Sequence, residues 1–412
     1  MALPARNIHD ETASLIARHR PGHAMAQGFY TSDTVYADDI ERIIMQDWHF
    51  AGLAGEIPDP GDFMLFELLD ESVILSRGAD GAIHALANVC RHRGSRVCLD
   101  RRGTARRFTC PYHAWVYDLD GSLRSARLMG DDLDRAALGL KKVPMELFHG
   151  MIFVSFAARP TSFAAIRADL DPVLAPFALE RTKIACRKSY PVAANWKLLV
   201  ENYNECYHCA PAHPEFRRAH PTHMDAARMQ PFNDAMAPRA AALGIATEYI
   251  DKVGTLCPEG SVDYTFSRHS LYDGYATGSE DGQPLAPLLG NLAGYDNAAS
   301  DLYVGLLNPM LIYNDHVVIY RFIPDGKDRS VQEIIWLVRE DAEAGKDYHP
   351  DRLTWLWDVT TIADKAIIED NQKGVASRYY DPGPLAEMEA YTARFLATYL
   401  DRLARHPQGA NE

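Results

Sequence analysis

The chain of 412 residues carries a formal net charge of −14, with 47% hydrophobic and 24% charged residues. This length favours two domains over a single core. The acidic balance argues against nucleic-acid binding, which needs a basic surface. No apolar run approaches the roughly 20 residues that cross a bilayer, so we expect no membrane partner.

The N-terminus and the cysteines bear on the compartment. Residues 1–20 mix charged and polar side chains and lack the apolar core of a secretory signal. Seven cysteines without dense paired spacing do not predict a disulfide framework. We therefore expect a cytoplasmic protein in a reducing setting.

Three regions follow one another along the chain. Residues 1–45 predict a helical lead-in, which we expect to pack with the C-terminal domain. Residues 46–157 carry short β-type runs separated by turn sequences such as Asp59-Pro60-Gly61, which predict a small antiparallel β domain. Residues 158–412 alternate longer helical and strand segments and end in a predicted helix at 387–403. The expected fold class is α+β, with an all-β domain before a mixed one.

Two pairs of potential metal ligands lie in the β domain. Cys90-Arg91-His92 is followed, after a gap of 17 residues, by Cys110-Pro111-Tyr112-His113. Two thiolates on one iron and two imidazoles on the other hold a [2Fe–2S] cluster with a raised potential. A structural zinc site is the alternative, although zinc fingers usually group Cys with Cys and His with His. Cys90, His92, Cys110 and His113 therefore predict a cluster that delivers single electrons.

A second metal motif lies in the segment 195–214, which predicts a helix. Its apolar face at helical spacing consists of Trp196, Leu199, Val200, Tyr203 and Tyr207. Its second face consists of Glu201, Glu205 and His208. Pro211 should end the helix, so that His213 can turn back toward His208. Two imidazoles and a remote carboxylate form the facial triad of non-haem Fe(II) oxygenases. A helix with two ordinary histidines is the alternative.

The remote carboxylate is expected on a predicted helix at 353–375. Asp364 has mainly uncharged neighbours one turn away, whereas Asp358 and Glu369 share a polar face with a lysine and a glutamine. Asp370 also has apolar neighbours and stays open as the alternative. We expect Asp364 to join the two histidines.

Together these motifs resemble those of the Rieske non-haem iron oxygenases of the ring-hydroxylating type. The resemblance rests on Cys-Arg-His-Arg-Gly at 90–94, Cys-Pro-Tyr-His-Ala-Trp at 110–115 and the segment 195–214. It implies a Rieske β domain, followed by a helix-grip domain in which a curved antiparallel sheet wraps a long helix and encloses a mononuclear Fe(II). In the family the third ligand is an Asp five residues before Glu-x-x-Gln, a pattern that Asp364 matches.

The resemblance also implies a role for Glu205. By position alone, this residue lies one helical turn before His208 and can orient that imidazole. In the family the equivalent carboxylate bridges a cluster histidine of one subunit, here His113, to an iron-site histidine of its neighbour. Such a bridge implies a ring-shaped homo-oligomer, most simply an α3 trimer. Most aromatic-ring dioxygenases have Asp here, and Glu resembles the subgroup that acts on carnitine and related quaternary ammonium compounds.

Aromatic residues are the candidates for substrate binding. The segments 264–290 and 308–318 resemble those of betaine and stachydrine demethylases. Because a quaternary ammonium has no N–H, aromatic faces hold it by cation–π attraction. The expected substrate-binding residues are Tyr203, Phe266, Tyr303 and Tyr313, and we expect Asn202 to face bound O2 or substrate.

The resemblance implies the terminal oxygenase of a two-component monooxygenase. Electrons from NAD(P)H would reach it through a separate flavin or ferredoxin-type reductase. The arginines between 91 and 107 are a candidate docking patch for that reductase, with loop charge balance as the alternative for part of them. With O2, the enzyme would hydroxylate an N-methyl group of a betaine, which leads to N-demethylation and release of formaldehyde. An aromatic-ring hydroxylase or O-demethylase is the alternative within the family; an electron carrier or a zinc-stabilised binding module is the alternative outside it.

Overall fold

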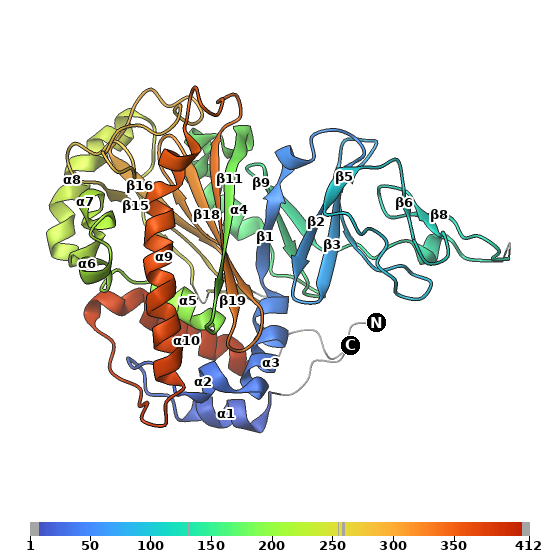
Figure 1. Cartoon of the computed structure of the whole chain (residues 1–412), viewed down its shortest axis with the longest axis horizontal. Coiled ribbons are helices and arrows are strands. Elements are labelled where there is room, and N and C mark those ends of the chain that lie inside the picture. The colour runs from blue at the N-terminus through green and yellow to red at the C-terminus, as the bar shows by residue number, and fades with distance from the viewer. Residues whose placement is uncertain (1–7, 131, 254, 258–259, 406–412) are drawn as a thin grey trace. The chain divides into compact units, whose positions relative to one another are not determined.

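The computed structural model describes residues 8–405 except 131, 254, 258 and 259. The chain divides into two compact units (Figure 1): a β unit from Trp48 to Phe156, and an α+β unit formed by the residues up to Asp47 and from Ala157 onward. The helical lead-in thus belongs to the same unit as the C-terminal region. Among the described residues, no helix is both long and apolar enough to cross a membrane.

The described part of the β unit contains three antiparallel sheets. The first has the order β1 (Trp48–Leu53), β10 (Met151–Ser155) and β9 (Met145–Phe148). The second has the order β4 (Ile83–Ala87), β3 (Glu71–Arg77), β2 (Asp62–Leu68) and β5 (Arg102–Thr104). The third has the order β6 (Phe108–Thr109), β7 (Val116–Tyr117) and β8 (Leu123–Ser125). The prediction of an all-β domain is confirmed.

The core of the β unit lies against the two predicted ligand loops. Ile74, Leu86 and Tyr117, from three different strands, pack in one buried cluster that also contains Cys90 and Cys110. Burial of a large apolar side chain contributes about 1.5–3 kcal/mol. The hydrophobic core therefore holds the two cysteines in place.

The α+β unit is built on one large antiparallel sheet. Its seven strands have the order β11 (Thr182–Val192), β19 (Ser330–Arg339), β18 (Val317–Pro324), β17 (Pro309–Ile312), β16 (Ala298–Val304), β15 (Tyr264–Ser270) and β12 (Ile250–Asp251). A separate short pair consists of β13 (Thr255–Cys257) and β14 (Gly260–Val262). The mixed fold class that the sequence predicts is therefore confirmed.

Helices flank this sheet. The lead-in supplies α1 (Asp10–Ala17), α2 (Gly28–Thr31) and α3 (Asp33–Arg42). The rest of the unit supplies α4 (Ala164–Leu174), α5 (Trp196–Tyr203), α6 (Cys209–Ala212), α7 (Phe216–Ala219), α8 (Ala226–Ala242), α9 (Pro350–Val375) and α10 (Ala390–Ala404). Helix α9 runs along the sheet (Figure 1) and contacts both β11 and α5.

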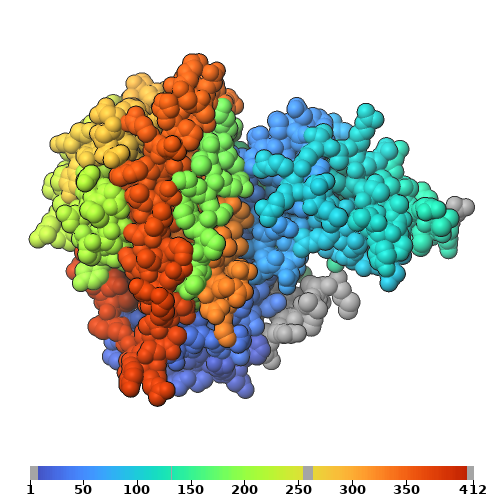
Figure 2. Space-filling model, viewed as in Figure 1, coloured from blue at the N-terminus to red at the C-terminus, as the bar shows by residue number. Residues whose placement is uncertain are grey.

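Helix α9 ends at Val375 as the sequence predicts and begins three residues earlier than predicted. Pro350 occupies its first turn, where the missing N–H costs nothing and the fixed φ suits a helix. Buried residues recur every three to four positions, as an amphipathic helix requires. They include Leu353, Leu356, Trp357, Thr360 and Thr361. The other side of α9 lies at the surface (Figure 2), where Ile362 is 56% exposed.

Buried polar contacts join the lead-in to the helices that follow. Asp39 of α3 forms an ion pair with Lys197 of α5, and both side chains are fully buried. Asp39 also accepts hydrogen bonds from Tyr399 Oη at 2.5 Å and from Trp196 Nε1 at 3.2 Å. Burial lowers the pKa of Lys197 and raises that of Asp39, and their mutual attraction opposes both shifts. Removal of one partner would leave a buried charge without compensation, so the set anchors α5.

Candidate metal centres and active site

The four predicted cluster ligands lie on two turns with the same backbone pattern. In the first, the Cys90 N–H donates to Ser95 O at 2.8 Å, and the Gly94 N–H donates to Cys90 O at 3.0 Å. In the second, the Cys110 N–H donates to Trp115 O at 2.8 Å, and the Ala114 N–H donates to Cys110 O at 3.0 Å.

The fifth residue of each turn has a left-handed backbone, with φ of 78° at Gly94 and 58° at Ala114. The pairs Cys-x-His and Cys-x2-His, which differ in sequence spacing, are therefore presented by equivalent turns.

The side chains on these turns converge. His92 Nδ1 lies 3.1 Å from His113 Nδ1, and Cys90 and Cys110 are only 3% and 2% exposed. The Arg91 N–H donates to Tyr117 Oη at 3.0 Å, which leaves the tyrosine O–H free to donate to Cys90 Sγ at 3.3 Å. Two buried thiols beside two adjacent imidazole nitrogens form the donor set that a Rieske-type [2Fe–2S] cluster requires.

The iron-motif segment is not the single helix that the sequence predicts. Helix α5 ends at Tyr203, so Glu201 and Glu205 do not share a helical face. The Glu205 carboxylate accepts hydrogen bonds from the backbone N–H groups of Tyr207 and His208. Such local bonds compete with continuation of a helix, and this is the physical reason for the wrong prediction.

Two neighbouring expectations are wrong for the same reason. Tyr207 was expected on the apolar face and is instead 56% exposed. Pro211 does not end a helix; it lies within the four-residue helix α6, at whose beginning no backbone N–H is needed. His208 and His213 flank α6, one at each end.

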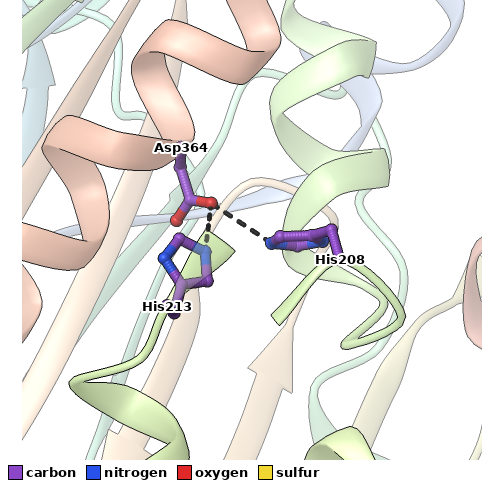
Figure 3. Close-up of side chains that lie close together, drawn as sticks. All are labelled: His208, His213 and Asp364. Carbon is purple, nitrogen blue, oxygen red and sulfur yellow. Dashed lines mark hydrogen bonds and ion pairs between the residues drawn. The ribbon is translucent and has the colours of Figure 1, made fainter. Parts of the chain in front are cut away.

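The two histidines meet Asp364 of α9 (Figure 3). Asp364 Oδ1 lies 2.8 Å from His213 Nε2 and 3.2 Å from His208 Nε2. One ligand atom from each residue lies within 4.8 Å of the other two. Two imidazoles and one carboxylate that converge in this way fit a mononuclear Fe(II) with open positions.

Electrostatics at the triad favour a bound cation. Burial alone would raise the pKa of Asp364, but hydrogen bonds from His208 and His213 keep it below its usual range. Burial alone would lower the pKa of His208, but Asp364 and Glu205 raise it to about 9. Two carboxylates thus hold one imidazole in its cationic form, and a divalent ion can take the place of that proton.

The other carboxylates of α9 have different partners. Asp370 is exposed and lies 2.8 Å from Lys373 Nζ. Asp358 lies 2.7 Å from Lys188 Nζ. Glu369 accepts a hydrogen bond from the Ala193 N–H at 2.9 Å. Of the two candidates that the sequence leaves open, the structure places Asp364, and not Asp370, beside the histidines.

Glu205 and Asn202 both contact His208. Glu205 Oε1 lies 2.5 Å from His208 Nδ1, which directs the other ring nitrogen toward Asp364. Asn202 Nδ2 lies 3.4 Å from His208 Nε2. Glu205 therefore positions the His208 imidazole, and Asn202 lies next to the nitrogen of that imidazole that faces Asp364.

A cavity of about 620 Å³ lies at the triad. Alternate residues of the sheet face it, so its wall follows the two-residue period of the strands. They include Thr265, Ser267 and His269 of β15, Ala299, Asp301 and Tyr303 of β16, and Tyr320 and Phe322 of β18. His208, His213, Asp364, Asn202 and Tyr203 complete the wall near the metal site.

Two of the four predicted substrate-binding residues are not part of this wall. Tyr203 and Tyr303 line the cavity, but Phe266 and Tyr313 do not. Thr265 and Ser267 of β15 face the cavity, so the side chain of Phe266 between them lies on the opposite side of the strand. There it is fully buried. Tyr313 lies behind the wall, where its hydroxyl donates to His220 Nε2 at 2.8 Å. The expectation that these two side chains touch a substrate is therefore wrong.

The cysteines next to His208 also differ from expectation. Cys206 and Cys209 form a disulfide, with a Cα–Cα distance of 4.9 Å. This distance lies within the range that a disulfide spans. Cys-x-x-Cys spacing was the signal that sequence reasoning missed.

Comparisons with known proteins agree with this geometry. The chain matches the Rieske [2Fe-2S] domain over residues 47–143. It matches the catalytic domain of the ring hydroxylating alpha subunit over residues 179–262 and 308–405. A solved quaternary ammonium Rieske monooxygenase has the same fold, with a TM-score of 0.71 at 20% identity over 97% of this chain and 100% of that one.

The chain therefore belongs to the ring-hydroxylating Rieske oxygenase alpha-subunit family. It is the oxygenase subunit of a Rieske-type monooxygenase, an oxidoreductase with a [2Fe–2S] centre and a mononuclear iron centre. The predicted family and cofactors are confirmed. The zinc-module and electron-carrier alternatives are wrong, because the catalytic-domain family matches as well.

Two curated relatives are similar over most of their length. The glycine betaine monooxygenase oxygenase subunit of Chromohalobacter salexigens is 33% identical over 399 residues, which cover 92% of this chain and 86% of the relative. The carnitine monooxygenase oxygenase subunit of Escherichia coli is 29% identical over 369 residues, which cover 85% of this chain and 84% of the relative.

Proposed function

We propose that this oxygenase hydroxylates an N-methyl group of a betaine-type quaternary ammonium compound, which then loses formaldehyde. The observation that carries the proposal is the aromatic wall of the cavity at the iron triad. Tyr203 lies at its centre, with ring centroids 5.7 Å from Tyr303, 5.1 Å from Tyr320 and 5.9 Å from Phe322. Aromatic faces attract a cation that has no hydrogen to donate, by about 0.5–2 kcal/mol each. The names of both curated relatives point to the same substrate class.

The reaction balances with one O2, two electrons and two protons. When bound, the cluster supplies single electrons and the mononuclear iron activates O2. One oxygen atom enters a C–H bond of the N-methyl group and the other leaves as water. In the N–CH2–OH product the C–N bond breaks, the nitrogen keeps the electron pair, and the carbon leaves as formaldehyde while the hydroxyl proton goes to solvent. His208, His213 and Asp364 would hold the iron at the cavity, and Glu205 orients His208.

Glu205 is also the residue that we propose to face His113 of a neighbouring copy in a homotrimer. Exposed apolar side chains near both centres support this arrangement. Near the cluster loops, Leu99 is 70% and Tyr112 is 54% exposed. Near the triad, Tyr207 is 56% exposed. An interface that joins the cluster of one copy to the triad of the next would cover all three side chains.

A separate reductase is the electron donor that we propose. Part of the arginine-rich surface near the cluster is paired within the β unit, because Arg102 contacts Glu56, Arg107 contacts Asp118, and Arg96 contacts Glu67. The remaining positive charge of this surface suits an acidic flavin or ferredoxin-type reductase and would raise the rate of encounter.

Product analysis tests the proposed reaction. The iron-loaded protein is supplied with NADH, O2 and a surrogate reductase, and is offered glycine betaine, carnitine, stachydrine, choline and several aromatic acids. We expect formaldehyde and the matching demethylated amine from at least one betaine. A hydroxylated aromatic acid, with no formaldehyde from any methylated amine, would overturn the substrate class and favour the aromatic-ring hydroxylase.

A further inference from the structure

Asp301 is an acidic residue of β16 whose side chain faces the cavity. Its neighbours Ala299 and Tyr303, two residues away on either side, face the cavity as well, and its cross-strand partner is Ser267 of β15. The side chain is 34% accessible. Because Asp301 lies in the cavity wall, a molecule in the cavity can reach its carboxylate.

This carboxylate has no hydrogen-bond donor among the residues that the structure describes. Its one ion-pair neighbour there is His269, whose Nε2 lies 3.7 Å from Asp301 Oδ2. That distance is too long for a hydrogen bond, and the same nitrogen lies 2.9 Å from Ser267 Oγ. Even a partly buried carboxylate loses part of its hydration, so one without donors is costly unless a positive charge is present.

The other carboxylates of the cavity wall have their own partners, apart from the exposed Glu387. Asp263 lies 2.5 Å from an Arg402 nitrogen, and Asp225 lies 3.4 Å from an Arg228 nitrogen. Glu205 and Asp364 contact the iron-site histidines. Within the described wall, Asp301 is therefore the partly buried carboxylate whose charge the protein itself leaves least compensated.

Asp301 also lies beside the aromatic wall. Burial raises the pKa of Tyr203 and of Tyr303, and the Asp301 charge adds to both shifts. Burial raises the pKa of Asp301 too, and His269 opposes that shift only in part. An anion next to aromatic faces attracts a cation from two sides.

We propose that Asp301 is the counter-ion of the substrate's quaternary ammonium group and determines the preference for cationic over neutral substrates. The proposal rests on the proposed function and specifies which residue selects the substrate class. The absence of donors fits this role, because the protein leaves the charge of the carboxylate available to a cation in the cavity.

Binding of matched ligand pairs tests the proposal. Each betaine is compared with an isostere in which a tert-butyl carbon replaces the quaternary nitrogen, for example glycine betaine with tert-butylacetate. Affinities are measured by calorimetry on the iron-loaded protein without reductase, so that no turnover occurs. Asp301→Asn removes the charge and keeps the shape. Asp370→Asn is the matched control, because it removes a carboxylate charge from the exposed side of α9, outside the cavity wall.

For the wild type we expect tighter binding of at least one betaine than of its isostere. In Asp301→Asn, betaine affinity should fall at least about tenfold, while affinity for the anionic isostere should rise. Opposite shifts for two ligands of one shape cannot come from a damaged fold. The melting temperature should stay equal or increase, since an uncompensated charge is lost. The control should change neither ligand by more than about twofold.

The outcomes distinguish a failure of the Asp301 proposal from a failure of the proposed function. If the wild type prefers betaines and Asp301→Asn keeps that preference, the role of Asp301 is overturned and the proposed function stands. If the wild type prefers none of the betaines over its isostere, both are overturned.

Discussion

The two metal centres of this chain are assembled in opposite ways. The proposed cluster ligands lie on two equivalent turns, and the histidines that meet are 21 residues apart. The proposed mononuclear site joins residues 151 positions apart, His213 directly after the short helix α6 and Asp364 in the middle of α9. The first centre depends on local backbone geometry and a small core. The second depends on how a long helix packs along a sheet, and it opens into the cavity of about 620 Å³.

The largest expected effect separates the two centres. A fully loaded chain should hold about three irons, two in the cluster and one at the triad. Asp364→Ala should reduce iron to about two per chain, stop product formation and keep the visible spectrum of the cluster. Cys110→Ser should instead remove the cluster and leave about one iron. Asp370→Ala is the control and should keep all three, because its side chain pairs with Lys373 at the surface. Loss of the cluster signal in Asp364→Ala would contradict the independence of the two centres.

Glu205→Gln tests a residue beside the mononuclear site, because it leaves every proposed metal ligand in place. The amide cannot hold the His208 imidazole as the carboxylate does, so turnover should fall by about 10- to 100-fold. Iron content and the cluster spectrum should match the wild type. Full activity in this variant would show that the carboxylate is not needed.

Lys197→Met tests how much the buried ion pair between α5 and α3 contributes to the free energy of unfolding. Loss of one partner of the buried pair with Asp39 should reduce the free energy of unfolding by about 3–5 kcal/mol. Arg107→Gln breaks an exposed pair in the β unit and should cost less than about 1 kcal/mol. Urea unfolding followed by circular dichroism measures both. Equal effects would mean that Lys197 and Asp39 do not act as a buried pair.

The smallest expected effect concerns the equivalence of the cluster turns. At Gly94 a Cβ would meet nothing within 4 Å, so Gly94→Ala costs only the left-handed backbone, about 1 kcal/mol. At Ala114 the reverse change to Gly should be neutral or slightly stabilising, since Gly adopts this backbone freely. The urea concentration at which the cluster absorbance is lost measures both. A large loss in Ala114→Gly would contradict the equivalence.

The sequence predicts best what depends on neighbours in the chain. The Cys and His pairs belong to complete local turns, and the repeat of buried residues marks α9 almost to its ends. The uncharged neighbours of Asp364 on one helix favour it but leave Asp370 open, and the structure places Asp370 at the surface beside Lys373.

Other features depend on contacts that no local pattern reveals. The end of α5 comes from the Glu205 side chain, which takes over backbone N–H groups. The position of Phe266 depends on which face of β15 meets the cavity, and a shift of one residue reverses that choice. Here the polar residues Thr265, Ser267 and His269 face inward, opposite to the usual expectation for a strand that lines a protein interior. Sequence reasoning also did not single out Asp301, whose cross-strand neighbour Ser267 lies on this inward face.

The ratio of formaldehyde formed to O2 consumed tests the central claim most directly. It would be measured with the betaine that gives most product, in the wild type and in Asp364→Ala. The account predicts a ratio close to one in the wild type, and neither formaldehyde nor substrate-dependent O2 uptake in the variant. Substrate-dependent O2 uptake by the wild type without formaldehyde, or formaldehyde that persists in Asp364→Ala, would contradict N-demethylation at this site.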